Sequence, residues 1–370
     1  ASDVYKRQRL NNNMIHYFNY YMIMERGINI GAILLSIILV SFASSCQKEL
    51  LNESEMSATR AYGEKTPKVV TYIDVNDTNP LNAMLYRMDN EPFSDVAILY
   101  AANIRANGTE PELWLNDNMT KLLVPDPGST TTGHYKYILP LQDDGTKVLL
   151  SILGTDQSIG LGNLTEANQQ KFAEILAWTV EAFGLDGIDF DGDEGWYQYG
   201  DNSDFPESVD GSFSGLIIKL RDEFDERFQN EHKLITVLDT GYATQLTSEA
   251  VNVCDYGWYP YVSPNAYVSA TSPWTNSKWS AQALSLNTFY SAITLYQVKN
   301  RSAQSKNDGM GAITTYNLQL HTVMDPLSVL QKIGEGAFSN VVTRSSTPSL
   351  GYAIDWSSEN GTAICYDDIY

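Results

Sequence analysis

The 370-residue chain is poor in cysteine, histidine and positive charge, and each shortage argues against a class of protein. Its three cysteines form no CxxC pair and supply neither a disulfide framework nor a pair of metal ligands. The four histidines do not cluster, so a histidine metal site is not expected. Acidic residues number 45 against 24 basic ones, and the net charge of −21 disfavours electrostatic binding to nucleic acid or to an anionic membrane surface. We therefore expect neither a metal centre nor a nucleic-acid partner.

What the chain does contain is apolar residues in quantity. They make up 43% of it, against 19% charged residues, a composition that fills a sizeable core and argues against a disordered chain. The length suits one large domain or two ordinary ones. The composition indicates an acidic soluble domain whose chemistry rests on carboxylates and aromatic side chains.

The first 65 residues are typical of a targeting segment followed by a tether. Residues 1–21 do not begin with methionine and show no clear period, so we interpret them as an upstream extension that is not native to the protein. Residues 22–45 contain an apolar run, 28–43, which is short for a membrane span and precedes small residues, as in a signal peptide. A transmembrane anchor is the alternative interpretation. Residues 46–65 are polar and aperiodic, which predicts a tether.

The end of the apolar run indicates a lipoprotein. Residues 43–46 read Ala-Ser-Ser-Cys and resemble a bacterial lipobox, which implies lipid chains on Cys46. Several acyl chains on one cysteine anchor a protein stably, whereas a single chain is marginal. Residues 47–49 loosely resemble the export signal of surface lipoproteins in Bacteroidetes-type bacteria. We therefore expect a monomer held by lipid at the bacterial outer membrane or cell surface.

The rest of the chain alternates between short β-rich runs and amphipathic helical patterns. The predicted strands are residues 69–75, 95–101, 147–153, 187–191, 234–239, 256–259, 312–316 and 350–354. The predicted helices are residues 165–183, 212–228, 281–298 and 326–333. Such alternation favours a parallel sheet covered on both sides by helices. Eight strands predict a single TIM-type (β/α)8 barrel over residues 66–370, with a doubly wound sheet as the alternative.

The densest cluster of reactive side chains is the run 186–194, which reads DGIDFDGDE. Alternate residues of a strand point the same way, so Asp189 and Asp191 share one face. Two carboxylates that face a barrel interior are costly to bury and push each other's pKa values apart, which suits catalysis. A calcium loop is an alternative, but Glu194 stands where an EF-hand loop has its glycine. A solvated acidic loop is another.

This run resembles the DGxDxDxE signature of family 18 glycoside hydrolases. Three further blocks, residues 75–82, 99–104 and 147–154, are similar to the bacterial endo-β-N-acetylglucosaminidases of the F and H types. The blocks occur in the right order, and the similarity covers roughly residues 68–260. The combination of blocks is more specific than the carboxylate run alone.

The resemblance implies a TIM-type barrel that cleaves between the two core N-acetylglucosamines of N-linked, high-mannose glycans on glycoproteins. It also implies substrate-assisted retaining catalysis without a metal or cofactor, in which the nucleophile belongs to the substrate. A glutamic acid protonates the glycosidic oxygen, and the 2-acetamido carbonyl attacks the anomeric carbon. A neighbouring aspartate orients the acetamido group, and the same glutamate then activates water.

The sequence departs from the family pattern at the acid. The pattern places the acid two residues after the last motif aspartate, and here that position is Asp193, with Glu194 one residue later. Either a bulge at Gly192 turns Glu194 toward the sugar, or Asp193 replaces the acid. We favour Glu194 as the acid. Asp191 would then orient the acetamido group, and Asp189 would support Asp191 through a hydrogen bond.

Aromatic residues near the expected barrel mouth are candidates for sugar binding. Tyr256 and Tyr259 follow the fifth predicted strand where the family uses aromatics around the acetamido group, and Trp196 lies just after the carboxylate run. Each of these aromatics also fits a packing role. Because the acid is displaced, two other functions remain open, a glycan-binding protein without catalysis and an enzyme acting on another N-acetylglucosamine polymer such as chitin.

Overall fold

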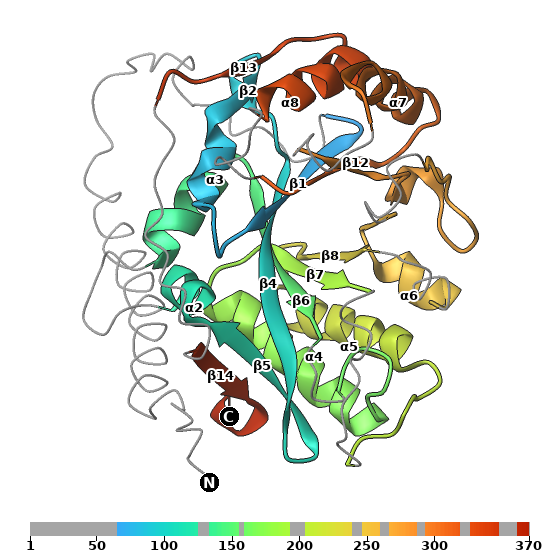
Figure 1. Cartoon of the computed structure of the whole chain (residues 1–370). Helices are drawn as coiled ribbons and strands as arrows, with labels where there is room; N and C mark the ends of the chain where they lie inside the picture. Colours follow the sequence, from blue (N-terminus) through green and yellow to red (C-terminus); the bar gives the residue numbers. More distant parts are fainter. Residues whose placement is uncertain are drawn as a thin grey trace, which may run out of the picture.

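The computed structural model describes nine segments of the chain, most of them part of one barrel (Figure 1). They are residues 65–124, 133–154, 159–192, 204–238, 246–259, 266–286, 293–318, 326–347 and 361–369. In these segments no helix is long and apolar enough to cross a membrane. The predicted site residues Cys46, Asp193, Glu194 and Trp196 lie outside the described residues.

Parallel strands form a nearly closed barrel, as the sequence predicts. Every neighbouring pair along the barrel is parallel. In their order around the barrel, the strands are β1 (Lys68–Asp74), β4 (Val96–Asn107), β6 (Lys147–Leu153), β7 (Gly187–Asp191), β8 (Leu234–Leu238), β9 (Tyr256–Trp258), β10 (Trp279–Ser280), β11 (Ala283–Ser285) and β12 (Ala312–Tyr316).

The seventh position of the barrel is filled by two short strands rather than one. Strand β10 pairs with β9, and β11 pairs with β12 on the other side. Between them Ser280 supplies a side-chain link, because its Oγ donates to the carbonyl of Gln282 at 2.9 Å and accepts the N–H of Thr314 at 3.1 Å. The segment from β10 to β11 therefore joins the two edges of the sheet.

Helices cover the outside of the barrel. Figure 1 shows α4 and α5 side by side below the strands and α7 and α8 together above them. The helices are α2 (Asp117–Leu123), α3 (Leu139–Asp143), α4 (Glu166–Ala182), α5 (Ser212–Arg227), α6 (Ser248–Val253), α7 (Leu295–Asn307) and α8 (Leu327–Ile333). Threonine side chains cap the amino ends of several helices. Thr165 accepts the N–H of Asn168 at the start of α4, and Thr294 forms a capping box with Gln297 at the start of α7.

Short helical turns and two small sheet extensions complete the described fold. The turns are η1 (Pro80–Leu85), η2 (His134–Ile138), η4 (Asn276–Lys278), η5 (Gly334–Phe338) and η6 (Tyr366–Asp368). Antiparallel β5 (Glu110–Asn116) extends the sheet from β4, and β14 (Gly361–Cys365) pairs with β5. A separate antiparallel sheet joins β2 (Tyr86–Met88), β3 (Glu91–Pro92) and β13 (Val342–Arg344).

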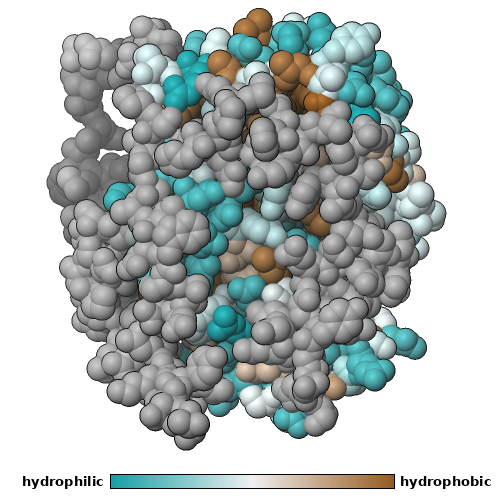
Figure 2. Space-filling model, in the orientation of Figure 1, coloured by the Kyte–Doolittle hydropathy of each residue, from teal (hydrophilic) through white to brown (hydrophobic). Residues whose placement is uncertain are grey.

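Apolar residues pack in two layers separated by the strands. The larger core lies between strands and helices and includes Ile188 and Phe190 of β7. The smaller one fills the barrel interior and includes Tyr72, Ile98 and Trp258. Figure 2 shows mainly hydrophilic residues on the described part of the visible surface. Three large apolar side chains of the described residues are exposed, Tyr135, Tyr296 and Val341.

Three aspartates stabilise the amino ends of barrel strands with one repeated arrangement. Each directly precedes a strand, and its backbone and carboxylate both bond to one residue of the neighbouring strand. Asp255 donates its N–H to the carbonyl of Ile235 at 2.8 Å and accepts the N–H of Ile235 on Oδ2 at 2.9 Å. Asp95 pairs in the same way with Val69, and Asp186 with Val148.

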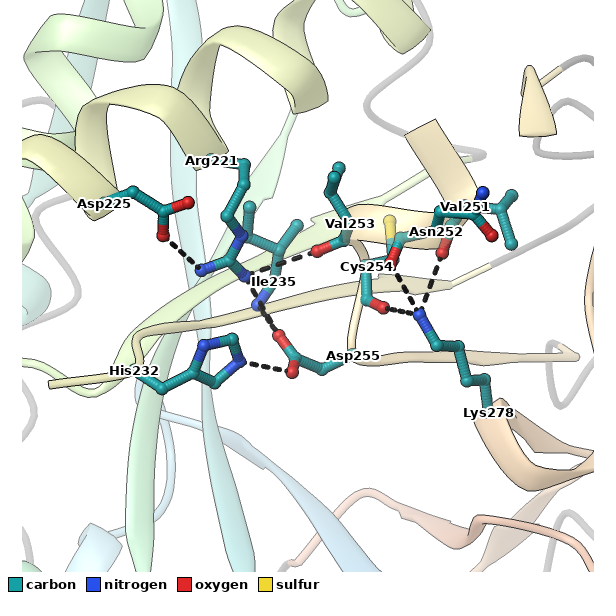
Figure 3. Close-up of polar contacts among 10 residues, drawn as sticks. All are labelled: Arg221, Asp225, His232, Ile235, Val251, Asn252, Val253, Cys254, Asp255 and Lys278. Carbon is teal, nitrogen blue, oxygen red and sulfur yellow. Dashed lines mark hydrogen bonds and ion pairs between the residues drawn. The ribbon is translucent and has the colours of Figure 1, made fainter. Parts of the chain in front are cut away.

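Each of these carboxylates also meets a cationic or ionisable side chain. Around Asp255, Arg221 Nη2 lies 3.2 Å from Oδ2 and His232 Nε2 lies 2.6 Å from Oδ1 (Figure 3). Figure 3 also shows Lys278, whose Nζ bonds to the carbonyls of Val251, Asn252 and Cys254 at the end of α6. Lys65 pairs with Asp95 at 3.0 Å and Lys147 with Asp186 at 2.8 Å.

The first six predicted strands occupy the first six barrel positions. Two later predictions are wrong. Residues 312–316 form the eighth position rather than the seventh, and the predicted helix 281–298 contains strand β11, with α7 beginning only at Leu295. A short apolar run such as AQALSL fits either a helix or a strand, so periodicity could not decide. The predicted strand 350–354 lies outside the described residues.

Candidate active site

Asp189 lies at the centre of a polar cluster inside the barrel. It is fully buried, and its carboxylate accepts three hydroxyl hydrogen bonds. Oδ1 accepts from Thr236 at 2.7 Å, and Oδ2 accepts from Ser151 at 2.8 Å and from Tyr72 at 2.9 Å. The three donors come from β8, β6 and β1. Strands that are distant in sequence therefore converge on one carboxylate.

The environment of Asp189 favours proton exchange near neutral pH. Burial raises the pKa of its carboxyl to about 6, and the hydrogen bonds from Thr236, Ser151 and Tyr72 act in the opposite direction. In the part of the chain that the structure describes, no ion pair includes Asp189. Hydroxyl groups rather than a cation thus compensate the buried charge, which leaves the carboxyl able to gain or lose a proton.

Asp191 is the last residue of β7 and stands at the carboxyl end of the barrel. It is 4% exposed, and it lies two residues beyond Asp189 along the strand. Ile188 and Phe190, which alternate with the aspartates, pack in the outer core. The strand period thus places both aspartates toward the interior, as the sequence predicts. In parallel barrels, this end carries the active site.

Four aromatic rings form a cluster beside Asp189, and none of them was among the predicted site residues. Tyr72 lies at their centre, with ring centroids 6.2 Å from Trp258, 6.0 Å from Tyr100 and 5.8 Å from Tyr316. Tyr100 and Tyr316 are partly exposed, whereas Tyr72 and Trp258 are fully buried. Inward-facing aromatics near the ends of predicted strands are the signal that would have found Tyr100 and Tyr316.

Tyr72 links the aromatic rings to the carboxylates. Its Oη accepts the indole N–H of Trp258 at 2.8 Å and donates to Asp189. Burial, followed by the charges of Asp189 and Asp191, raises the pKa of the Tyr72 hydroxyl well above its usual value. Tyr72 therefore remains a neutral hydrogen-bond donor over the whole physiological pH range.

A further polar group lines the ends of β1 and β12. Asp74 accepts the N–H of Asn76 on Oδ1 at 2.9 Å, and its own N–H donates to Asn317 Oδ1 at 2.9 Å. Burial raises the pKa of the Asp74 carboxyl. These side chains lie at the same end of the barrel as Asp191, and sequence reasoning missed them because no motif marks them.

Gly192 shows why the carboxylate run contains a glycine. Its N–H donates to the carbonyl of Leu238 at 2.9 Å, which continues the pairing of β7 with β8. A Cβ at this position would stand 2.5 Å from the same carbonyl oxygen, so a side chain would force the strand ends apart. Asp193 and Glu194 lie outside the described residues, so the bulge that would turn Glu194 inward stays a prediction.

The two tyrosines predicted to bind sugar lie on different sides of β9. Tyr256 packs against the interior core, with its ring beside Gly311 at the amino end of β12. Tyr259 packs against the outer core and donates its N–H to the carbonyl of Ser280 at 3.0 Å. Their contact with a glycan stays a prediction. Trp258, between them, donates its indole N–H to Tyr72 in the cluster around Asp189.

The described residues contain no group of three or more His, Cys, Asp or Glu side chains that could hold a metal ion. The buried thiols of Cys254 and Cys365 have pKa values raised to about 12, mainly by burial. Neither thiol is therefore an activated nucleophile. The chemistry of the described site rests on Asp189, Asp191 and the groups that surround them.

Comparison with known proteins places the chain among carbohydrate-cleaving enzymes. No protein-family model matches it. It is 35% identical over 276 residues to an endo-β-N-acetylglucosaminidase of Flavobacterium sp. (strain SK1022), covering 72% of this chain and 80% of the relative. It is 27% identical over 249 residues to endo-β-N-acetylglucosaminidase F1 of Elizabethkingia meningoseptica, covering 63% of this chain and 71% of the relative.

Among solved structures, the fold resembles that of Bacteroides thetaiotamicron EndoBT-3987. The structure of that protein with a Man5GlcNAc product has a TM-score of 0.63 and 22% identity, covering 82% of this chain and 66% of the other, just under two thirds of its length. The structure with a Man9GlcNAc2Asn substrate gives a TM-score of 0.62 at 22% identity, covering 82% of this chain and 72% of the other. At this identity the match shows the fold. The sequence relatives confirm the resemblance to the endo-β-N-acetylglucosaminidases: this chain belongs to that bacterial family of glycoside hydrolases.

Proposed function

We propose that the enzyme hydrolyses the β-1,4 bond between the two core N-acetylglucosamines of N-linked, high-mannose glycans on glycoproteins. The observation that carries this proposal is the buried, hydroxyl-bonded Asp189 two residues before Asp191 at the carboxyl end of the barrel. The names of the Flavobacterium and Elizabethkingia relatives support the bond that is cut. The Man5GlcNAc product bound to EndoBT-3987 supports the high-mannose substrate.

The proposed reaction is retaining and substrate-assisted. A carboxylic acid of the enzyme gives its proton to the glycosidic oxygen while the carbonyl oxygen of the 2-acetamido group attacks the anomeric carbon. The bond from carbon to the leaving oxygen breaks, and an oxazolinium-like ring forms on the substrate. The resulting carboxylate then takes a proton from water. The water oxygen attacks the anomeric carbon and opens the ring, with overall retention.

Asp191 and Asp189 have different roles in stabilising the oxazolinium-like ring. Asp191 orients the acetamido group through its N–H and offsets the positive charge that develops on it. Asp189 supports Asp191 by accepting a hydrogen bond while it is ionised. The raised pKa of Asp189, about 6, lets the pair hold one proton between them near neutral pH. Tyr72, Ser151 and Thr236 keep Asp189 in one orientation as the proton moves.

We assign the acid to Glu194, with Asp193 as the alternative. Asp193 and Glu194 follow Asp191, the last residue of β7, by two and three residues in the sequence. The glutamate is one methylene longer, and a misplacement of about 1 Å can cost roughly 10²-fold in rate. Asp193 and Glu194 are adjacent in the sequence. Replacing each in turn by its uncharged amide distinguishes which of them is the acid.

A gel-shift assay tests the proposed function. The protein without residues 1–46 is incubated with a high-mannose glycoprotein, beside Glu194→Gln and Asp193→Asn as matched variants that each remove one charge without changing shape. We expect the unmodified protein to release the glycan and Glu194→Gln alone to fail. Failure of Asp193→Asn alone would move the acid to Asp193. Glycan binding without cleavage by the unmodified protein would overturn the hydrolase proposal in favour of a binding protein.

We also propose that the enzyme acts as a lipid-anchored monomer at the outer membrane or cell surface. The apolar run 28–43 and the lipobox-like residues ending at Cys46 support the anchor. In a Bacteroidetes host fed labelled palmitate, the unmodified protein should carry label and sediment with outer membranes. Cys46→Ser should lose both properties, and a labelled Cys46→Ser protein would contradict the assignment. Light scattering of the soluble domain tests the monomer.

A further inference from the structure

Trp258 occupies an unusual place for a tryptophan in this barrel. It is fully buried in the interior core, and its ring meets Tyr72 edge-on with centroids 6.2 Å apart and planes at 90°. Its Nε1 lies 2.8 Å from Tyr72 Oη. Because no part of its side chain is exposed, Trp258 cannot bind the sugar directly, and any effect on catalysis must pass through its neighbours.

The chemistry of the three groups fixes the direction of the hydrogen bonds. An indole N–H can only donate, so Tyr72 Oη must accept from Trp258. The phenol has a single proton, and the acceptor 2.9 Å away on its other side is Asp189 Oδ2. With one lone pair of Oη taken by the indole, the proton of Tyr72 is left pointing at Asp189. The chain of bonds therefore runs in one direction, from Trp258 through Tyr72 to Asp189.

We propose that Trp258 is a positioning residue for the hydrolysis, which acts by holding the Tyr72 hydroxyl as a donor to Asp189. Hydrogen bonds in a chain polarise one another, so donation by the indole also strengthens the donation by the phenol. This stabilises the ionised form of Asp189, the form that in the proposed function accepts a hydrogen bond from Asp191. The inference rests on the proposed function, since it assigns Asp189 the same supporting role.

Packing alone would give Trp258 a different signature. A residue that only fills the interior would alter stability, and its effect on turnover would not depend on the hydroxyl of Tyr72. Trp279 supplies a matched control, because it is also buried and also donates its indole N–H, at 2.8 Å to the carbonyl of Val268. It packs in the outer core, away from the carboxylates.

The experiment is a double-mutant cycle on the protein lacking residues 1–46, with release of a high-mannose glycan as the assay. We expect Trp258→Phe to lower kcat about three- to tenfold and to leave KM unchanged. This factor corresponds to the loss of one buried hydrogen bond. The acid limb of the pH profile should move to higher pH, because an Asp189 with a weaker donor binds its proton more tightly. Trp279→Phe should leave kcat and the pH profile as they are.

The second arm uses Tyr72→Phe, which removes the hydroxyl through which Trp258 is proposed to act. In that background Trp258→Phe should change kcat less than about twofold. A separate readout is the indole N–H resonance of Trp258, assigned by its loss in Trp258→Phe, which should move in Tyr72→Phe while that of Trp279 stays in place.

Two results would overturn the inference. One is an effect of Trp258→Phe that keeps its full size in the Tyr72→Phe background, and the other is a pH profile that matches Trp279→Phe. If the unmodified protein releases no glycan, the proposed function fails instead, and the resonance measurement alone reports on the hydrogen bond. Thermal melting of every variant separates loss of folded protein from loss of turnover.

Discussion

Aspartates at the two ends of one barrel have opposite surroundings. At the amino end, Asp95, Asp186 and Asp255 each accept a backbone N–H from the preceding strand of the barrel and meet a basic side chain. Near the carboxyl end, the hydrogen-bond partners of Asp189 among the described residues are hydroxyl groups. Asp186 and Asp189 are three residues apart on the same segment. The partners, rather than the residue type or the strand, thus separate a stabilising carboxylate from a reactive one.

The comparison has a physical basis. A basic partner and a backbone donor bind the carboxylate through charge-assisted hydrogen bonds, so such a group holds neighbouring strands together. A buried carboxylate with neutral donors keeps a pKa near neutrality, which is costly for stability and useful for chemistry. Substitutions at the two ends should therefore affect different properties of the enzyme.

The largest effect should come from the carboxyl end. Asp191→Asn keeps the shape of the side chain but removes the charge that we propose stabilises the acetamido-derived ring. We expect kcat to fall about 10³-fold, equivalent to roughly 4 kcal/mol of transition-state stabilisation. Melting should stay close to that of the unmodified enzyme. If Asp191→Asn melted far lower but kept its kcat, the prediction would be wrong, because Asp191 would then stabilise the fold rather than the transition state.

The amino end should show the opposite pattern. Asp95→Asn leaves Lys65, whose side chain is 3% exposed, buried without its carboxylate 3.0 Å away. Removal of one partner from a buried ion pair costs about 3 kcal/mol or more of unfolding free energy. Urea denaturation measures this loss, and kcat per folded molecule should not change. An unchanged denaturation midpoint for Asp95→Asn would contradict a stabilising role of the ion pair between Asp95 and Lys65.

Asp189 should make stability depend on pH in an uncommon direction. Its pKa is raised in the folded protein, to about 6 from an ordinary value of 3.8, so the folded state holds more protons than the unfolded state between these values. Stability contributed at this residue is therefore present below about pH 4 and lost as pH rises to about 6, by on the order of 3 kcal/mol.

The matched measurement is the difference in unfolding free energy between Asp189→Asn and the unmodified enzyme. This difference should grow in favour of the variant from pH 4 to pH 6 and then level off. A difference that is flat with pH would mean that the hydroxyl donors fully offset the burial of Asp189.

The smallest effect should come from His232 at the amino end. Its ring is 60% exposed, and it lies 2.6 Å from Asp255, which Arg221 and the N–H of Ile235 already hold. Exposed ion pairs contribute little, so His232→Ala should cost less than about 1 kcal/mol by thermal melting. A larger loss would show that the histidine, rather than the arginine, is the main partner of Asp255.

Much of the fold and part of the site follow from the sequence. The strand period places Asp189 and Asp191 on one face without any structure. Ser151, Thr236 and Tyr72 could not be assigned in the same way, because each lies on a different strand and only the register of the barrel brings them to Asp189. Local periodicity carries no information on register between distant strands.

The missed seventh strand has a different cause. Strands β10 and β11 contain two and three residues, too few for a recognisable period. The acid raises yet another difficulty, since one inserted residue decides between Asp193 and Glu194. In a strand, one inserted residue reverses the face to which every later side chain points. The sequence pattern alone therefore cannot decide which carboxylate faces the barrel interior.

The split strand has a consequence for how the barrel opens. Local unfolding begins where few backbone bonds hold neighbouring elements together. Between β9 and β12 the sheet is continued by two short ladders, with the hydroxyl of Ser280 bonded across the interruption. We expect amide hydrogens along this seam, including that of Thr314, to exchange faster than those of β6 and β7. The barrel would then open locally between β9 and β12, while β6 and β7, which carry Ser151, Asp189 and Asp191, would remain paired.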